Sequence, residues 1–143
     1  MSRPLRLLCV LAIAALPLSA CSEVEEEEAT GYEPAKLEPV KGSDDLKRVT
    51  FTEEGAERVG LRTAPVREQG QAKVIPYAAV LYDAEGKTYV YTSPEPLSYV
   101  REEVEVERID GDRAQLSSGP PVGTEVVTVG AAEVYGTELE IAG

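Results

Sequence analysis

Short runs of apolar, β-branched and aromatic residues recur along the chain from about residue 48 onward. In one of them, residues 104–109, the apolar residues Val104, Val106 and, after one slip, Ile109 alternate with charged residues. A period of two is typical of an antiparallel strand with one buried face. The other runs predict further strands at residues 49–51, 61–67, 72–76, 79–82, 88–92, 113–116 and 125–129.

Turn-forming residues separate these runs and predict that neighbouring strands pair as hairpins. Residues 83–87 contain Gly86, and residues 110–112 have Gly111 at their centre; both segments connect two β-favouring runs. Thr52 stands directly before two glutamates, which predicts a single helical turn with Thr52 as its N-cap. Residues 48–143 are therefore expected to form one mostly β domain, a small antiparallel β-barrel or sandwich.

The N-terminus has the pattern of an export signal. Arg3 and Arg6 precede an apolar run at residues 7–16, which is shorter than the roughly 20 residues that a spanning helix needs. The run ends in Leu-Ser-Ala-Cys, which resembles the bacterial lipobox and implies that Cys21 is lipidated after removal of residues 1–20. We expect a lipid-anchored protein on the extracytoplasmic face of the cell membrane, periplasmic or at the cell surface. An ordinary cleavage site with a cysteine nearby is the alternative.

Residues 21–47 lack apolar periodicity and begin with a block of glutamates: Glu23, Glu25, Glu26, Glu27 and Glu28. Like charges in such a run repel one another, and the segment also contains several prolines and glycines. We expect a disordered acidic tether between the lipid and the β domain. A calcium or polycation site is the alternative interpretation of the acidic block.

Charge and composition exclude several classes of function. The chain has 26 acidic and 14 basic residues, and removal of Arg3 and Arg6 with the signal leaves a net charge of −14. This charge argues against nucleic acid as a partner. The chain has no histidine, and Met1 is its only methionine. With Cys9 removed and Cys21 lipidated, no imidazole, thioether or thiolate remains for a copper or zinc site or for His or Cys catalysis. A Ser-Lys or paired-carboxylate mechanism stays open, but the chain has no Gly-x-Ser-x-Gly or comparable motif, so we expect no enzyme, no cofactor and no metal.

Several phrases in the same order resemble the C-terminal portion of periplasmic adaptor subunits (membrane fusion proteins) of RND-type efflux pumps. They are residues 74–81, Gly86, residues 88–91, residues 104–106, Gly119, Gly123, residues 126–127 and residues 130–131. Upstream, residues 49–52 and 59–66 are similar to the segment that opens this region in heavy-metal-type adaptors.

Two parts of a full adaptor have no counterpart here. In those proteins a lipoyl-like domain and a long α-helical hairpin are inserted where this chain has only residues 66–72. The resemblance therefore covers the membrane-proximal region, which in the family lies against the transporter. It implies a non-catalytic binding module that is accessory to an efflux-type transporter or another envelope protein.

The tyrosines supply the candidate contact residues. Tyr89, Tyr91 and Tyr99 lie with Arg101 around residues 94–96, and tyrosine and arginine are enriched at the centres of protein interfaces. This pattern predicts a partner-contact patch, although tyrosine is also a common strand residue.

Two other functions stay open. One is a small-ligand or calcium-binding lipoprotein that uses turn carboxylates, namely Asp83, Glu85, Asp110 and Asp112. These acids are also ordinary turn residues. The other is a structural module of the cell envelope.

Overall fold

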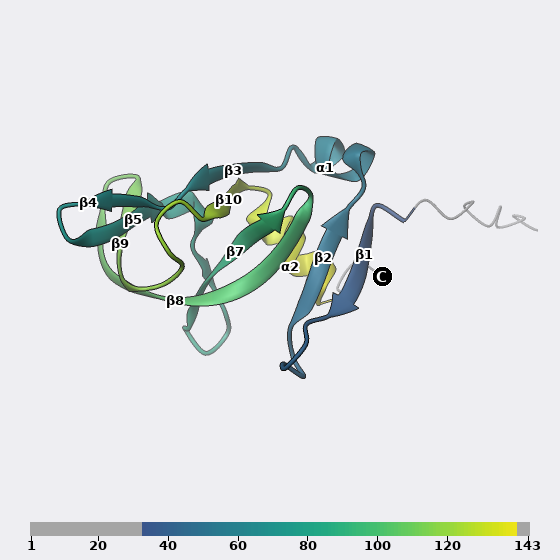
Figure 1. Cartoon of the computed structure of the whole chain (residues 1–143), viewed down its shortest axis with the longest axis horizontal. Helices are drawn as coiled ribbons and strands as arrows, with labels where there is room; N and C mark the ends of the chain where they lie inside the picture. The colour runs from purple at the N-terminus through teal and green to yellow at the C-terminus, as the bar shows by residue number, and fades with distance from the viewer. Residues whose placement is uncertain (1–32, 140–143) are drawn as a thin grey trace, which may run out of the picture. The chain divides into compact units, whose positions relative to one another are not determined.

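The computed structural model describes residues 33–139 (Figure 1). The predicted signal peptide, Cys21 and the acidic block lie outside the described residues, as do residues 140–143. In chain order the elements are β1 (Ala35–Pro39), β2 (Lys47–Phe51), α1 (Glu53–Val59), β3 (Arg62–Pro65), β4 (Arg67–Gln69), β5 (Ala72–Pro76), the 3₁₀ helix η1 (Tyr77–Ala79), β6 (Leu81–Tyr82), β7 (Thr88–Glu95), β8 (Ser98–Asp110), β9 (Arg113–Ser118), β10 (Glu125–Val129) and α2 (Ala131–Glu138). Within residues 33–139, each helix is too short or too polar to span a bilayer.

The strands form a mostly β, antiparallel fold, as the sequence predicts. The main sheet runs in the order β3-β10-β7-β8-β9-β5-β4. Its two end strands, β3 and β4, are consecutive in the chain with only Val66 between them. The Val66 N–H donates to the Thr124 carbonyl at 2.8 Å, and its carbonyl accepts from the Gly123 N–H at 2.8 Å. The sheet therefore curls, and both of its ends belong to one continuous segment.

The strand β8 connects two parts of this sheet. Its first half pairs with β7 and its second half with β9, and β2 joins it at Val49↔Tyr99. The register with β9 shifts between Glu105 and Val106 and again between Val106 and Arg108. After these shifts Ile109 stands opposite Ala114, on the same face as Val106 opposite Leu116, but it is 45% exposed whereas Val104 is buried. The slip predicted before Ile109 is therefore present, and Ile109 follows the inner face but stays partly exposed next to the end of the strand.

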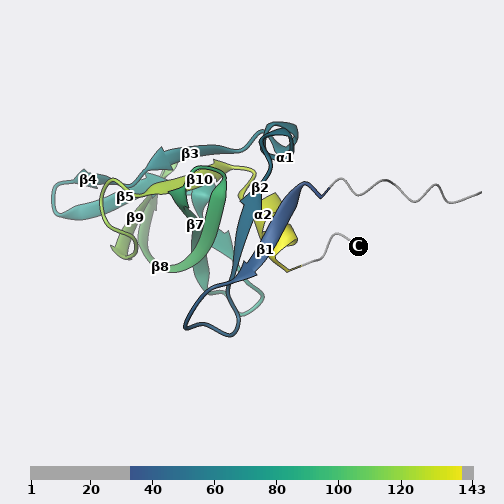
Figure 2. The ribbon, with the colours of Figure 1, turned by 45° about the vertical axis from the view of Figure 1, so that its right-hand side comes forward.

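Two hydrophobic clusters lie on opposite faces of the sheet. Consecutive residues divide between them: Val90 belongs to the first cluster and Tyr91 to the second, and Val126 and Val127 divide in the same way. This follows from the strand period of two, which points neighbouring side chains to opposite faces. Helices α1 and α2 contribute Ala56 and Val134 to the second cluster, whereas the first is enclosed by the curled sheet (Figures 1 and 2).

Local predictions from turn residues are confirmed. The hairpins at residues 83–87 and 110–112 form as expected, between β6 and β7 and between β8 and β9. Thr52 caps α1, and its hydroxyl oxygen accepts from the Gly55 N–H at 3.0 Å. The run at residues 79–82 is only partly a strand, because Ala79 closes a 3₁₀ turn.

Two elements differ from the sequence-based expectation. The tether predicted to extend to residue 47 includes β1, which pairs with β2 over its whole length and directs Ala35 and Leu37 against the second cluster. Helix α2 follows the last predicted strand, where no element was expected. Both are short, at five and eight residues, so an apolar period is hard to recognise in them, and packing against the rest of the domain holds them in place.

Candidate functional site

The structure places the predicted contact residues in two different environments. Tyr91 is 0% exposed and Tyr99 is 4% exposed, and both belong to the second hydrophobic cluster. Tyr99 packs against the ring of Phe51 with 6.1 Å between centroids. Only Tyr89 and Arg101 keep partial exposure. The four side chains therefore do not form one surface patch, because the face on which Tyr91 and Tyr99 lie is covered by α1 and α2.

Two of the four residues, Tyr91 and Arg101, contact a carboxylate that sequence reasoning missed, that of Glu138. Glu138 is 1% exposed, and its Oε2 accepts a hydrogen bond from the Tyr91 hydroxyl. The Arg101 Nε lies 3.1 Å from the same oxygen, and the Lys47 backbone N–H donates to Oε1 at 3.2 Å. The Arg101 guanidinium also lies over the rings of Tyr89 and Tyr135, at 4.9 and 5.5 Å from their centroids.

These contacts make an internal ion-pair cluster that attaches α2 to β7 and β8. Burial, and then the hydrogen bond to Glu138, raise the pKa of Tyr91 far above its ordinary value of 10.0, so the hydroxyl stays protonated and donates. A buried carboxylate needs such partners because its desolvation is costly. The sequence analysis did not identify Glu138, because residues 131–138 show no pattern that predicts a helix with Glu138 on its buried side.

The outer face of β4, β5, β9 and β8 carries the more accessible polar groups. Val74 in β5 stands opposite Arg67 of β4 on one side and Gln115 of β9 on the other. Gln115 in turn stands opposite Arg108 of β8, and Arg113 lies two residues before Gln115 on the same face. We refer to Arg67, Val74, Arg108, Arg113 and Gln115 as the arginine face. Val66, Ile75, Ala114 and Leu116, which alternate with them along the strands, are buried in the first cluster.

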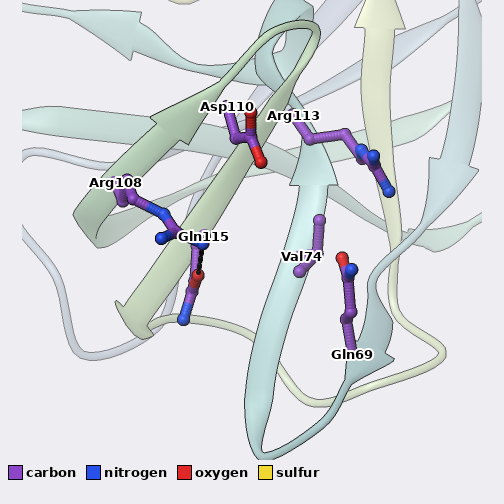
Figure 3. A pocket seen from close by; sticks show the side chains of 6 residues that line it. All are labelled: Gln69, Val74, Arg108, Asp110, Arg113 and Gln115. Carbon is purple, nitrogen blue, oxygen red and sulfur yellow. Dashed lines mark hydrogen bonds between the residues drawn. The ribbon is translucent and has the colours of Figure 1, made fainter.

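A polar pocket of about 280 Å³ lies on the arginine face (Figure 3). Gln69 and Asp110 complete its lining. The Arg108 Nη2 donates to the Gln115 Oε1 at 3.2 Å, which leaves the other N–H groups of that guanidinium available. A second hollow of about 210 Å³ adjoins it, shares Val74 and Arg113, and includes Arg67. The pocket thus presents forked donors beside one carboxylate acceptor, a combination that fits polar side chains of another protein.

The turn carboxylates do not gather into a cation site. The Asp83 Oδ1 accepts from the Glu85 and Lys87 N–H groups at 3.0 and 2.8 Å, which makes it a turn-closing residue. Desolvation raises the pKa of Asp83, but the hydrogen bonds from Lys87, Tyr89 and Glu85 outweigh it and lower the pKa overall. Across residues 33–139, no three His, Cys, Asp or Glu side chains come together in a way that could hold a metal ion.

Comparison with known proteins adds no relative from which a site could be transferred. No protein-family model, no curated protein and no solved structure matches the chain.

Proposed function

We propose that this chain is a non-catalytic binding module that lipid on Cys21 holds at the extracytoplasmic face of a membrane. There it docks through the arginine face onto a membrane protein, and the resemblance to adaptor subunits favours an efflux-type transporter. The observation that carries the docking surface is the row of Arg67, Val74, Gln115 and Arg108 across four strands, with Arg113 beside it.

The composition of this face favours a protein partner. Arginine is enriched at protein interfaces because its planar fork pairs with carboxylates through two parallel hydrogen bonds. Three of the chain's 14 basic residues lie on this one face, although the chain as a whole carries a net charge of −12. Val74 adds a partly buried apolar surface at the centre of the row. A complementary partner surface would present acidic side chains around an apolar residue.

The position of the face also suits docking. Figures 1 and 2 show β4, β5 and β9 at one end of the described domain and β1, where the described chain begins, at the other. The proposed lipid anchor precedes β1 in the chain, and β1 lies at the end of the described domain away from the arginine face. The face is free to meet a protein that projects from the same membrane.

Crosslinking and pull-down from native membranes test this proposal. The full chain is compared with Cys21→Ala, with the double variant Arg108→Ala/Arg113→Ala, and with Arg58→Ala as a matched control. Arg58 is also exposed, at 65% of its side chain, but belongs to α1. We expect the wild type and Arg58→Ala to recover the same transporter, and the other two variants to recover at least about tenfold less, equivalent to roughly 1.4 kcal/mol.

Each contrary outcome has a distinct meaning. Recovery of the transporter by Arg108→Ala/Arg113→Ala at the wild-type level would show that docking uses another surface. Equal recovery by Cys21→Ala would show that lipid is not required. If the wild type recovers no membrane protein, the docking proposal is wrong.

A further inference from the structure

The strand β1 has one edge that no described strand covers. It pairs with β2 on one side, and Figures 1 and 2 show it at the margin of the sheet with no further strand beyond it. An unpaired edge exposes a row of backbone donors and acceptors that another strand can bind. The groups that face outward are decided by the register of β1 and β2.

Two hydrogen bonds fix that register. The Thr52 N–H donates to the Pro34 carbonyl at 2.9 Å, and the Val40 N–H donates to the Leu46 carbonyl at 3.0 Å. In an antiparallel pair only alternate residues bond to the partner strand. The even-numbered residues of this segment therefore bond to β2, and Ala35, Leu37 and Pro39 direct their backbone groups outward. Pro39 lacks only an outward N–H, so it does not weaken the pairing with β2.

The sequence of β1 is complementary to itself. When a second copy of Ala35–Pro39 runs antiparallel with Leu37 opposite Leu37, each Lys36 stands opposite Glu38 of the other copy. Centring the pair on Lys36 or on Glu38 instead places like charges opposite each other, which is unfavourable. Lys36 and Glu38 are both exposed and share the face away from the second hydrophobic cluster.

We propose that the protein forms a two-fold symmetric dimer by pairing β1 with β1 of a second copy. Each Leu37 N–H donates to the Leu37 carbonyl of the other copy, and each Ala35 N–H donates to the Pro39 carbonyl. The geometry thus supplies four backbone hydrogen bonds, two at Leu37 and two at the Ala35–Pro39 positions, together with two Lys36–Glu38 ion pairs. The dimer is isologous, as most closed protein dimers are.

This pairing is independent of the proposed docking, because β1 and the arginine face lie at opposite ends of the described domain (Figure 1). Membrane attachment strengthens it where Cys21 is lipidated. Two copies confined to one membrane meet at a higher effective concentration than they do in solution. A dimer also attaches through two anchors, which hold better than one.

Charge exchange on β1 tests the proposal. The full chain in mild detergent, and reconstituted in vesicles, is compared with Lys36→Glu, Glu38→Lys and the double exchange. Association is measured by sedimentation in detergent and by energy transfer between labelled chains on vesicles. We expect each single variant to dimerise at least about tenfold more weakly than the wild type, and the double exchange to recover the wild-type affinity.

Mixing the two single variants gives the most specific result. A chain with Glu at 36 and 38 is complementary to a chain with Lys at both positions, so the mixture is expected to pair more strongly than either variant pairs with itself. Lys41→Glu changes the charge by the same amount outside the strand and should behave as the wild type. Thermal unfolding of every variant checks the fold, because Glu38 also stands opposite Arg48 within its own chain.

Three outcomes overturn the proposal. The wild type could stay monomeric both in detergent and on vesicles. The two single variants could associate as strongly as the wild type, which would place any dimer contact elsewhere. The mixture of variants could fail to pair although each is folded, which would mean that Lys36 does not meet Glu38.

Discussion

The hydroxyl of Tyr91, in the middle of β7, donates a hydrogen bond to the carboxylate of Glu138, which is the last residue of α2 and lies 47 positions later in the chain. This bond and the ion pair with Arg101 join the C-terminal helix to the centre of the sheet. Tyr91 and Glu138 are both buried, so water does not reach their polar groups in the folded protein. If the helix shifted away from the sheet without unfolding, the hydroxyl and the carboxylate would be left without hydrogen-bond partners, which is costly.

Removal of the Glu138 carboxylate should destabilise the domain strongly. Glu138→Ala leaves Arg101, whose side chain is only 12% exposed, without its partner, and breaking a buried ion pair costs about 3–5 kcal/mol. Glu133→Ala, at an exposed position of the same helix, should change the free energy of unfolding by no more than about 0.5 kcal/mol. Urea unfolding measures both, and equal stability of the two variants would contradict a structural role for the cluster.

Replacing both members of the pair should cost less than the two single changes together. In Arg101→Met/Glu138→Met no buried charge is left unpaired, so the coupling between the sites should be about 0.5–3 kcal/mol in a double-mutant cycle. The two residues contact each other directly at 3.1 Å, which is the condition for such coupling. Additive single effects would show that the ion pair itself contributes nothing.

Stability should fall at alkaline pH because of Tyr91. Its pKa is raised in the folded state, first by burial and then by Glu138, so its contribution is complete below pH 10.0 and is lost as the pH rises above that value. Above pH 10 the free energy of unfolding should therefore fall less steeply with pH in Tyr91→Phe than in the wild type. The difference in slope should be up to about 1.4 kcal/mol per pH unit. Denaturant unfolding between pH 9 and 11 checks this; parallel curves for the two proteins would contradict it.

Two glycines with the same backbone angle should respond differently to alanine. Gly86 and Gly130 both have a φ of 84°. A Cβ added at Gly86 would meet no atom within 4 Å, but a Cβ added at Gly130 would lie 2.5 Å from Leu61 Cδ2 and 2.8 Å from Val59 Cγ1. Gly86→Ala should cost only the left-handed strain, about 1 kcal/mol. Gly130→Ala should cost about 2–4 kcal/mol, because overpacking adds to that strain. Thermal unfolding distinguishes the two.

The cap of α1 gives a smaller and separable effect. Thr52→Ala removes the acceptor for the Gly55 N–H and should lower stability by about 1 kcal/mol, whereas Thr52→Ser keeps the hydroxyl and should restore most of it. Chemical denaturation of the three proteins measures the difference. Equal losses for Ala and Ser would indicate that the threonine methyl group, and not the hydroxyl, is what matters.

The parts of the fold that were predicted correctly depend on local sequence patterns. The turns at Gly86 and Gly111 could be predicted as hairpins because the strands that they join are adjacent in sequence. The start of α1 could be predicted at Thr52 because its capping hydrogen bond reaches only three residues along the chain. The slip predicted before Ile109 is present in the pairing with β9, but the alternation of residues 104–109 does not reveal that Ile109, next to the end of β8, stays 45% exposed.

The sequence by itself therefore determined the antiparallel β class, the hairpins, the helix cap and a chemistry without histidine. The tertiary structure alone decided that Tyr91 and Tyr99 are buried, that Glu138 meets Arg101, and that three arginines share one face. It also decided that β1 joins the sheet with a self-complementary edge turned outward. The physical reason is distance along the chain: turns, caps and periodicity act over a few residues, whereas burial and pairing depend on which distant strands come together and in which register.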